Sequence, residues 1–162
     1  MYRWVECFQF SERRCTGRIA RPSPEVIYEW PAVNKQRGEG MANIKSYTVD
    51  YDWKAELEVE IDHDVVTEEM LHEINNFWSD AEYRLGRQDS ILNTVLIMLA
   101  KEALLLALIE GYNTRGVVAA FDWDEGNGVE GWPPMDGSQG IKITSVDVSG
   151  ILDSDDMTIK AA

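Results

Sequence analysis

Cysteine and histidine, two common metal-binding residues, are scarce in this sequence, which has two of each among 162 residues. Both cysteines, Cys7 and Cys15, lie near the start. This pattern predicts no disulfide framework, and a reducing cytoplasm is the expected compartment. We also expect no secretory signal, because Met1 to Phe10 carries Arg3 and Glu6 and lacks a long apolar run.

Basic residues are in deficit. The chain has 15 of them against 29 acidic residues, for a formal net charge of -14. Such a charge repels nucleic acid and anionic membranes and attracts basic protein surfaces. We therefore expect no direct nucleic-acid binding, no membrane association and a basic protein as partner, in the cytoplasm of a bacterial host.

The charge is unevenly distributed. The first 40 residues hold seven basic and five acidic residues, whereas the remaining 122 hold eight basic and 24 acidic residues. Residues 1–40 also show neither helical nor strand periodicity, so we interpret them as an N-terminal arm and residues 41–162 as a single acidic α+β domain. Purine-rich codons for Arg37 to Gly40 would resemble a ribosome-binding sequence. We therefore expect that translation of the natural protein starts at Met41. The alternative is a genuine, loosely ordered N-terminal arm.

Two segments alternate apolar and polar residues, a pattern typical of half-buried strands. The first begins at Ile44, and the second runs from Ala55 to Asp62 after a turn expected around Asp52 to Lys54. The short connection predicts an antiparallel hairpin. The expected apolar face of the first strand consists of Tyr47, Val49, Tyr51 and Trp53.

Helical spacing follows the hairpin. Thr67 is the expected N-cap of an amphipathic helix that runs to Leu85, with Gly86 as its stop. Asp89 or Ser90 caps a second helix, which ends at Gly111.

A short third helix is expected from Asn113 to Phe121. A long loop follows, then a strand from Ile141 to Val148 with a bulge, and a short last strand from Met157 to Ala161. The order β-β-α-α-α-β-β predicts an α+β fold, in which two long helices and a short one cover one face of a mostly antiparallel sheet of about four strands.

Alternate residues of the second strand are acidic and stand about 6.6 Å apart on one face. Such a row of carboxylates can imitate a phosphate backbone and occupy a basic groove. The alternative is a solvated sheet face, but the net charge of residues 41–162 exceeds the magnitude of about 2–8 that suffices for solubility. The candidate partner-binding residues are Glu56, Glu58, Glu60 and Asp62, supported by Asp50, Asp52, Asp64, Glu68 and Glu69.

Two other features allow a weaker functional interpretation. His63 and His72 lie near carboxylates, but no complete ligand set is visible, so we expect no metal and no cofactor. Trp132 and Met135 flank a Pro-Pro turn and are a possible apolar anchor for a partner. The favoured alternative is that Trp132 folds back into the core.

Ile91 to Ile109 is apolar on nearly every side. We reject a transmembrane interpretation, because charges occur near the middle and basic flanks are absent. Ile97, Leu104 and Leu108 share one face, which needs a cover from the C-terminal strands, the N-terminal arm or a second copy of the protein.

From Met41 onward the chain resembles a family of small acidic bacterial proteins of unknown function, common in prophages and other mobile elements. The resemblance offers no catalytic residues to carry over. It rests on Tyr47-Thr48-Val49-Asp50, Glu60-Ile61-Asp62-His63-Asp64, Leu71-His72-Glu73-Ile74-Asn75 with Phe77-Trp78, and Val129 to Ser138.

These observations favour a non-enzymatic binding protein that inhibits a basic nucleic-acid-binding host protein through DNA mimicry. CRISPR effectors are the natural candidates by analogy with anti-CRISPR proteins of mobile elements. The alternative is a small structural or accessory protein, as a monomer or a homodimer. A metal-dependent enzyme that uses His63 and His72 is the third hypothesis.

Overall fold

The computed structural model describes residues 43–123 and 128–160, so the expected N-terminal arm lies outside the described residues. In chain order the elements are β1 (Ile44–Tyr51), β2 (Ala55–Asp62), α1 (Glu68–Phe77), α2 (Ala81–Leu85), α3 (Ile91–Glu110), α4 (Thr114–Ala120), β3 (Ile141–Asp147) and a short 3₁₀ helix, η1 (Ser154–Asp156).

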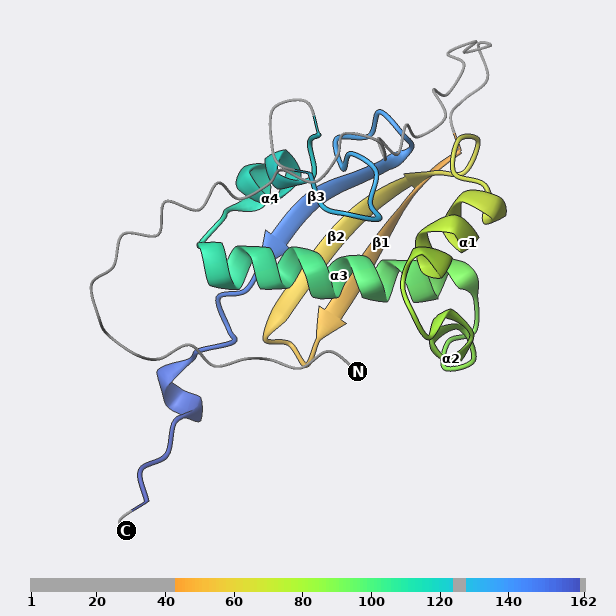
Figure 1. Ribbon diagram of the computed structural model, residues 1–162. Helices are drawn as coiled ribbons and strands as arrows, with labels where there is room; N and C mark the ends of the chain where they lie inside the picture. The colour runs from red at the N-terminus through yellow and green to blue at the C-terminus, as the bar shows by residue number, and fades with distance from the viewer. Residues whose placement is uncertain (1–42, 124–127, 161–162) are drawn as a thin grey trace, which may run out of the picture. The chain divides into compact units, whose positions relative to one another are not determined.

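The three strands form one antiparallel sheet in the order β1-β2-β3 (Figure 1). The predicted hairpin is confirmed, with Tyr47 opposite Val59 and Val49 opposite Leu57. Leu57 and Val59 of the central strand are fully buried. The alternation that predicted β2 therefore reflects one face packed in the core, whereas much of edge strand β1 is exposed.

The predicted bulge occurs where β2 meets β3. Glu58 lies opposite Ser145 and Val59 opposite Ile143, so Thr144 is the extra residue. Past this point the side-chain alternation of β3 is shifted by one residue relative to β2. The bulge thereby places Ser145 and Asp147 on the same sheet face as Glu58.

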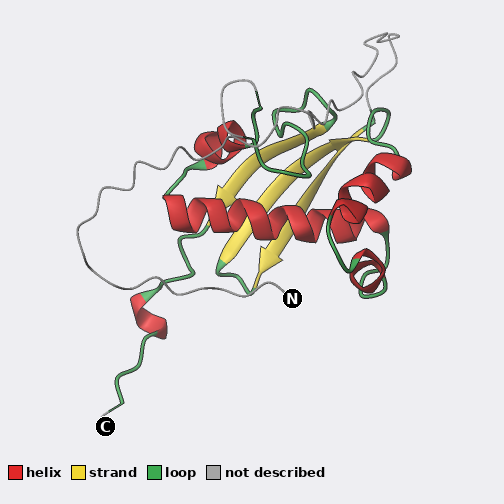
Figure 2. Ribbon diagram, viewed as in Figure 1, coloured by secondary structure: helices red, strands yellow, loops and turns green. Residues whose placement is uncertain are grey.

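Helix α3 lies across one face of the sheet (Figures 1 and 2). It begins where expected, because the Ser90 hydroxyl accepts a hydrogen bond at 3.1 Å from the N–H of Asn93. It ends at Gly111, whose φ of 68° is left-handed. Leu99 and Ala103 are fully buried between the helix and its neighbours.

The prediction of one helix from Thr67 to Leu85 is wrong. Thr67 does cap α1, but that helix ends at Phe77, and left-handed Asp80 precedes the separate helix α2. The Arg84 side chain donates to the carbonyl oxygens of Trp78 and Ser79 in the break. The freed backbone acceptors are thereby satisfied, as a helix end requires.

The loop before β3 folds inward. Trp132 and Met135 are 2% and 0% exposed, and the Trp132 ring meets Phe121 edge-on at 6.3 Å between centroids. Trp123 Nε1 donates to the Trp132 carbonyl at 3.2 Å. The packing of Trp132 in the core is confirmed. A role for Trp132 and Met135 as an exposed anchor is wrong, because burial leaves no surface to contact.

The predicted fourth strand is also wrong, since residues 157–160 form no strand. Met157 and Ile159 are largely exposed. At the outer edge of β3, the N–H of Val146 donates to the Thr114 hydroxyl of α4 at 3.1 Å. This backbone donor, which a further strand would need, is therefore already used.

Candidate functional site

The strand register sorts the acidic residues onto one side of the sheet. Side chains of directly opposed residues in antiparallel strands lie on the same face. The face opposite α3, called the open face below, is formed by Ile44, Ser46, Thr48 and Asp50 of β1, Glu56, Glu58, Glu60 and Asp62 of β2, and Lys142, Ser145 and Asp147 of β3.

Three carboxylates form a row across the open face. Glu56 of the central strand lies opposite Asp50 on one side and Asp147 on the other. Neighbouring strands are about 4.8 Å apart, and like charges directly opposite each other destabilise a sheet. Asp147 was missed by the sequence reasoning, because only the bulge brings it onto this face.

The Asp147 carboxylate is held in its charged form by its own turn. Its Oδ1 atom accepts a hydrogen bond from the N–H of Ser149 at 2.8 Å. This bond is the main reason that the pKa of Asp147 lies below its usual value.

Lys142 is the basic residue of the open face, and it neutralises one end. Its Nζ atom lies 3.0 Å from a carboxylate oxygen of Glu60. Both side chains are substantially exposed, so the pair adds little stability. The negative charge is consequently concentrated around Glu58, Glu56 and their neighbours toward the β1–β2 turn.

Asp62, opposite Ile44, lies on the open face at the far end of β2, and Asp64 lies in the turn that follows the strand. Both also support the local backbone. Asp62 Oδ1 accepts from the N–H of Asp64 at 3.0 Å. Asp64 Oδ2 accepts from the N–H of Asn43 at 3.1 Å.

Glu68 and Glu69 do not join the row. They occupy the first turn of α1, which packs against α3 rather than on the open face. Hydrogen bonds from the backbone N–H of Glu69 itself and from the Thr67 side chain lower the pKa of the Glu69 carboxyl group. Their place in the first turn of α1 is explained by capping, and their role in partner binding stays a prediction.

The two histidines have separate surroundings. His63 Nε2 is 2.8 Å from the Tyr47 hydroxyl, whereas His72 lies on α1. Within residues 43–123 and 128–160, no group of three or more His, Cys, Asp and Glu side chains is arranged to hold a metal ion.

The outer face of α3 is the main apolar surface of the helices. Ile97 and Leu108 are 44% and 39% exposed, and Leu104 is half-buried. Leu105 and Ile109 add to this surface and were missed. By length and hydropathy α3 is the one described helix that is able to cross a membrane, but its other side packs on β2 and β3.

The turn between β1 and β2 has an unusual backbone. Asp52 and Trp53 both have positive φ, 54° and 55°, and the N–H of Lys54 donates to the Tyr51 carbonyl at 2.9 Å. We expected Trp53 on the apolar face of the strand, but β1 ends at Tyr51, and the turn leaves Trp53 92% exposed.

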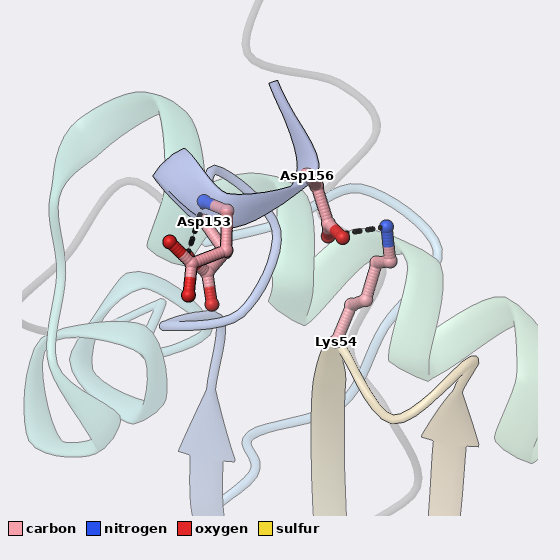
Figure 3. A network of polar contacts seen from close by, with 4 residues as sticks. Lys54, Asp153 and Asp156 are labelled. Atoms are coloured by element: carbon pink, nitrogen blue, oxygen red, sulfur yellow. Dashed lines mark hydrogen bonds and ion pairs between the residues drawn. The ribbon is translucent and has the colours of Figure 1, made fainter. Parts of the chain in front are cut away.

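The C-terminal segment lies beside this turn (Figure 3). Lys54 Nζ is 2.9 Å from Asp156 Oδ2, and Asp153 caps η1 by accepting from the N–H of Asp155 at 2.9 Å. The bond to Asp156 raises the pKa of Lys54. The aspartates of η1 are therefore held next to the hairpin tip, where Asp50 and Asp52 already lie.

Comparisons with known proteins place the chain in a family. Residues 56–159 match the family described as Protein of unknown function (DUF2528). The chain is 69% identical over 122 residues to protein ea10 of Escherichia phage lambda, and equally to the lambda prophage-derived protein ea10 of Escherichia coli O6:H1 (strain CFT073). Both alignments cover 75% of this chain and 100% of the relative. No solved structure matches significantly. The resemblance inferred from the sequence motifs is confirmed, and the chain belongs to the DUF2528 family of proteins of unknown function.

Proposed function

We propose that the protein acts by binding, without catalysis, and that its open face occupies the nucleic-acid groove of a basic protein in the bacterial cytoplasm. The row formed by Asp50, Glu56 and Asp147 carries this proposal. Three carboxylates directly opposite one another repel each other and do not stabilise the sheet. A basic groove would relieve that repulsion and gain complementary charge.

The spacing of the acids supports the mimicry of a phosphate chain. Along β2, alternate side chains are separated by about 6.6 Å, and B-DNA phosphates on one strand are spaced on a comparable scale. Glu58 is exposed, and Glu56 is half-buried. The identity to proteins of phage lambda and a lambda prophage fits an inhibitor of a host nucleic-acid-binding protein, of which a CRISPR effector is one candidate.

The test compares two variants that remove the same number of charges. The open-face variant is Glu56→Gln, Glu58→Gln and Asp147→Asn. The matched control is Glu82→Gln, Asp89→Asn and Glu110→Gln, whose exposed residues lie on or beside the helices. Each protein is immobilised and exposed to nuclease-treated bacterial lysate, and bound proteins are identified by mass spectrometry.

The wild type and the control are expected to retain one basic nucleic-acid-binding protein, which added duplex DNA displaces. The open-face variant is expected to lose it. Equal retention by the open-face variant, or retention that DNA leaves unchanged, contradicts the proposal. Direct binding of a labelled oligonucleotide by the wild type contradicts it as well.

The second candidate function is that of a structural or accessory homodimer. The outer face of α3 favours it, because Ile91 to Ile109 contains only Lys101 and Glu102 as charged residues. Two strongly acidic copies would meet with least repulsion at such an acid-poor surface. The exposure of Ile97 and Leu108 leaves apolar area there for a second copy to bury.

Light scattering after size-exclusion chromatography tests the homodimer. The wild type should have twice the monomer mass, and Ile97→Lys with Leu108→Lys should restore the monomer. Leu152→Lys, at a position outside α3 that is 70% exposed, is the control and should remain dimeric. A monomeric wild type at high micromolar concentration excludes this candidate.

A further inference from the structure

The hairpin tip carries a residue that its backbone disfavours. A β-turn with positive φ at both central residues prefers glycine at the second one, as in Asp-Gly. Trp53 occupies that position at a φ of 55°, where a side chain with a Cβ atom is strained. Trp53 therefore destabilises the turn locally, relative to glycine at the same position.

Burial of the indole does not offset this destabilisation. Trp53 is 92% exposed, in contrast to Trp132, which is 2% exposed. Single exposed apolar residues are common on protein surfaces and need no explanation alone. Here exposure coincides with backbone strain, and strain of this kind concentrates at functional positions.

The surroundings of the indole are negatively charged. Asp50 and Asp52 both precede it in the chain, and Asp50 Oδ1 accepts a hydrogen bond from the N–H of Trp53 at 3.2 Å. Lys54, which follows Trp53, is paired with Asp156 at 2.9 Å. The contact between Lys54 and Asp156 adds the acidic end of the chain (Figure 3). An exposed flat aromatic ring next to carboxylates combines the same kinds of chemical group as an unpaired base next to phosphates.

We propose that Trp53 imitates an unpaired nucleobase, so that the basic partner is a protein that binds single-stranded or extruded bases. The ring enters a site lined by aromatic or arginine side chains, on which such proteins stack bases. Asp50 and Asp52 meet the basic groups that otherwise hold phosphates. This inference rests on the proposed function and narrows its class of partner.

Three single variants test the anchor with the captured partner protein as probe. Trp53→Gly removes the ring and relieves the strained φ, so any loss of binding is not due to unfolding. Trp53→Phe keeps an aromatic ring. Tyr83→Ala removes another exposed ring, on α2, and serves as the control.

Stacking on an aromatic side chain contributes about 1–3 kcal/mol per base, which corresponds to about 5-fold to 150-fold in affinity. Trp53→Gly should therefore bind the partner at least 5-fold more weakly, and Trp53→Phe should stay within a few-fold of wild type. Tyr83→Ala should bind as the wild type does.

Competition with two oligonucleotides separates stacking from charge. One is single-stranded DNA, and the other is an abasic chain with the same number of phosphates. The base-bearing chain should displace the wild type more effectively than the abasic chain does, and this preference should shrink for Trp53→Gly.

Wild-type affinity in Trp53→Gly overturns the inference, even if the open-face variant of the preceding subsection loses binding. Wild-type affinity in that open-face variant overturns the proposed function itself. The two failures are therefore distinguishable.

Discussion

The side-chain carboxylate of Asp50 accepts a hydrogen bond at 3.2 Å from the backbone N–H of Trp53, three residues further along the chain. This bond fixes the entry to a turn in which two non-glycine residues have positive φ. The effect of the backbone strain on stability can be measured separately from the effect of the exposed indole on partner binding.

Trp53→Gly is expected to stabilise the protein. Relief of the left-handed strain gains about 1–2 kcal/mol, and the larger chain entropy of glycine in the unfolded state cancels about half of it. Trp53→Ala removes the same ring but keeps the strain, so its stability should match the wild type. Denaturant unfolding measures both, and equal stability of the Gly and Ala variants contradicts the account of the turn.

Asn75 holds the break between α1 and α2. Its side chain is 1% exposed, donates to the Ala81 carbonyl at 3.1 Å and accepts from Arg84 Nε at 3.0 Å. Asn75→Ala leaves these groups without partners and should cost about 2–3 kcal/mol of unfolding free energy. The exposed neighbour Asn76 provides the control, since Asn76→Ala should change stability by less than about 0.5 kcal/mol.

Gly131 lets the loop before β3 approach α1. It has a φ of 76°, and an added Cβ atom would lie 2.5 Å from Cδ1 of Phe77. Gly131→Ala should therefore lose at least about 2 kcal/mol through strain and overpacking. Gly111 has a similar φ of 68° and open space around it, so Gly111→Ala should lose only about 1 kcal/mol. Equal losses in chemical denaturation would show that the Phe77 contact is unimportant.

Acid should weaken the turn that precedes β3. Asp136 Oδ1 accepts from the N–H of Ser138 at 2.8 Å, and hydrogen bonds from Ser138 lower the pKa of Asp136 below its unperturbed value of 3.8. A lowered folded pKa stabilises the protein above the unfolded value, and that stabilisation is lost as the pH falls through the folded pKa. The Tm difference between wild type and Asp136→Ala should thus be largest near neutral pH and shrink below 3.8. A difference that does not shrink as the pH is lowered through the acidic range contradicts this assignment.

A helix or strand can be predicted from the local sequence when its own residues determine where it begins and ends. The alternation of β2, the Ser90 cap and the Gly111 stop each lie within the element that they specify, and the structure confirms them. The break at Asp80 depends on Arg84 reaching backward to the preceding carbonyls, which hydrophobic spacing does not record. The missing fourth strand likewise depends on a contact between Thr114 and Val146, which are distant in sequence.

Some residues of the candidate site were also predictable from the local sequence, and others were not. The acids of β2 follow from period two alone, so their common face was predictable. Asp147 and Lys142 reach that face only through the pairing and bulge of a strand some 85 residues away. The exposure of Trp53 was mispredicted because the alternating pattern of the strand continues to this residue. In the structure, Asp52 and Trp53 have positive φ and form a turn instead.

The central claim is that carboxylates on the open face replace phosphates in a partner's groove. The most direct test is the affinity for the captured protein as a function of salt, for the wild type and for the variant with Glu56→Gln, Glu58→Gln and Asp147→Asn. Loss of three charges should weaken binding at low salt and flatten the dependence of log affinity on log salt. An unchanged affinity and an unchanged slope would contradict the account.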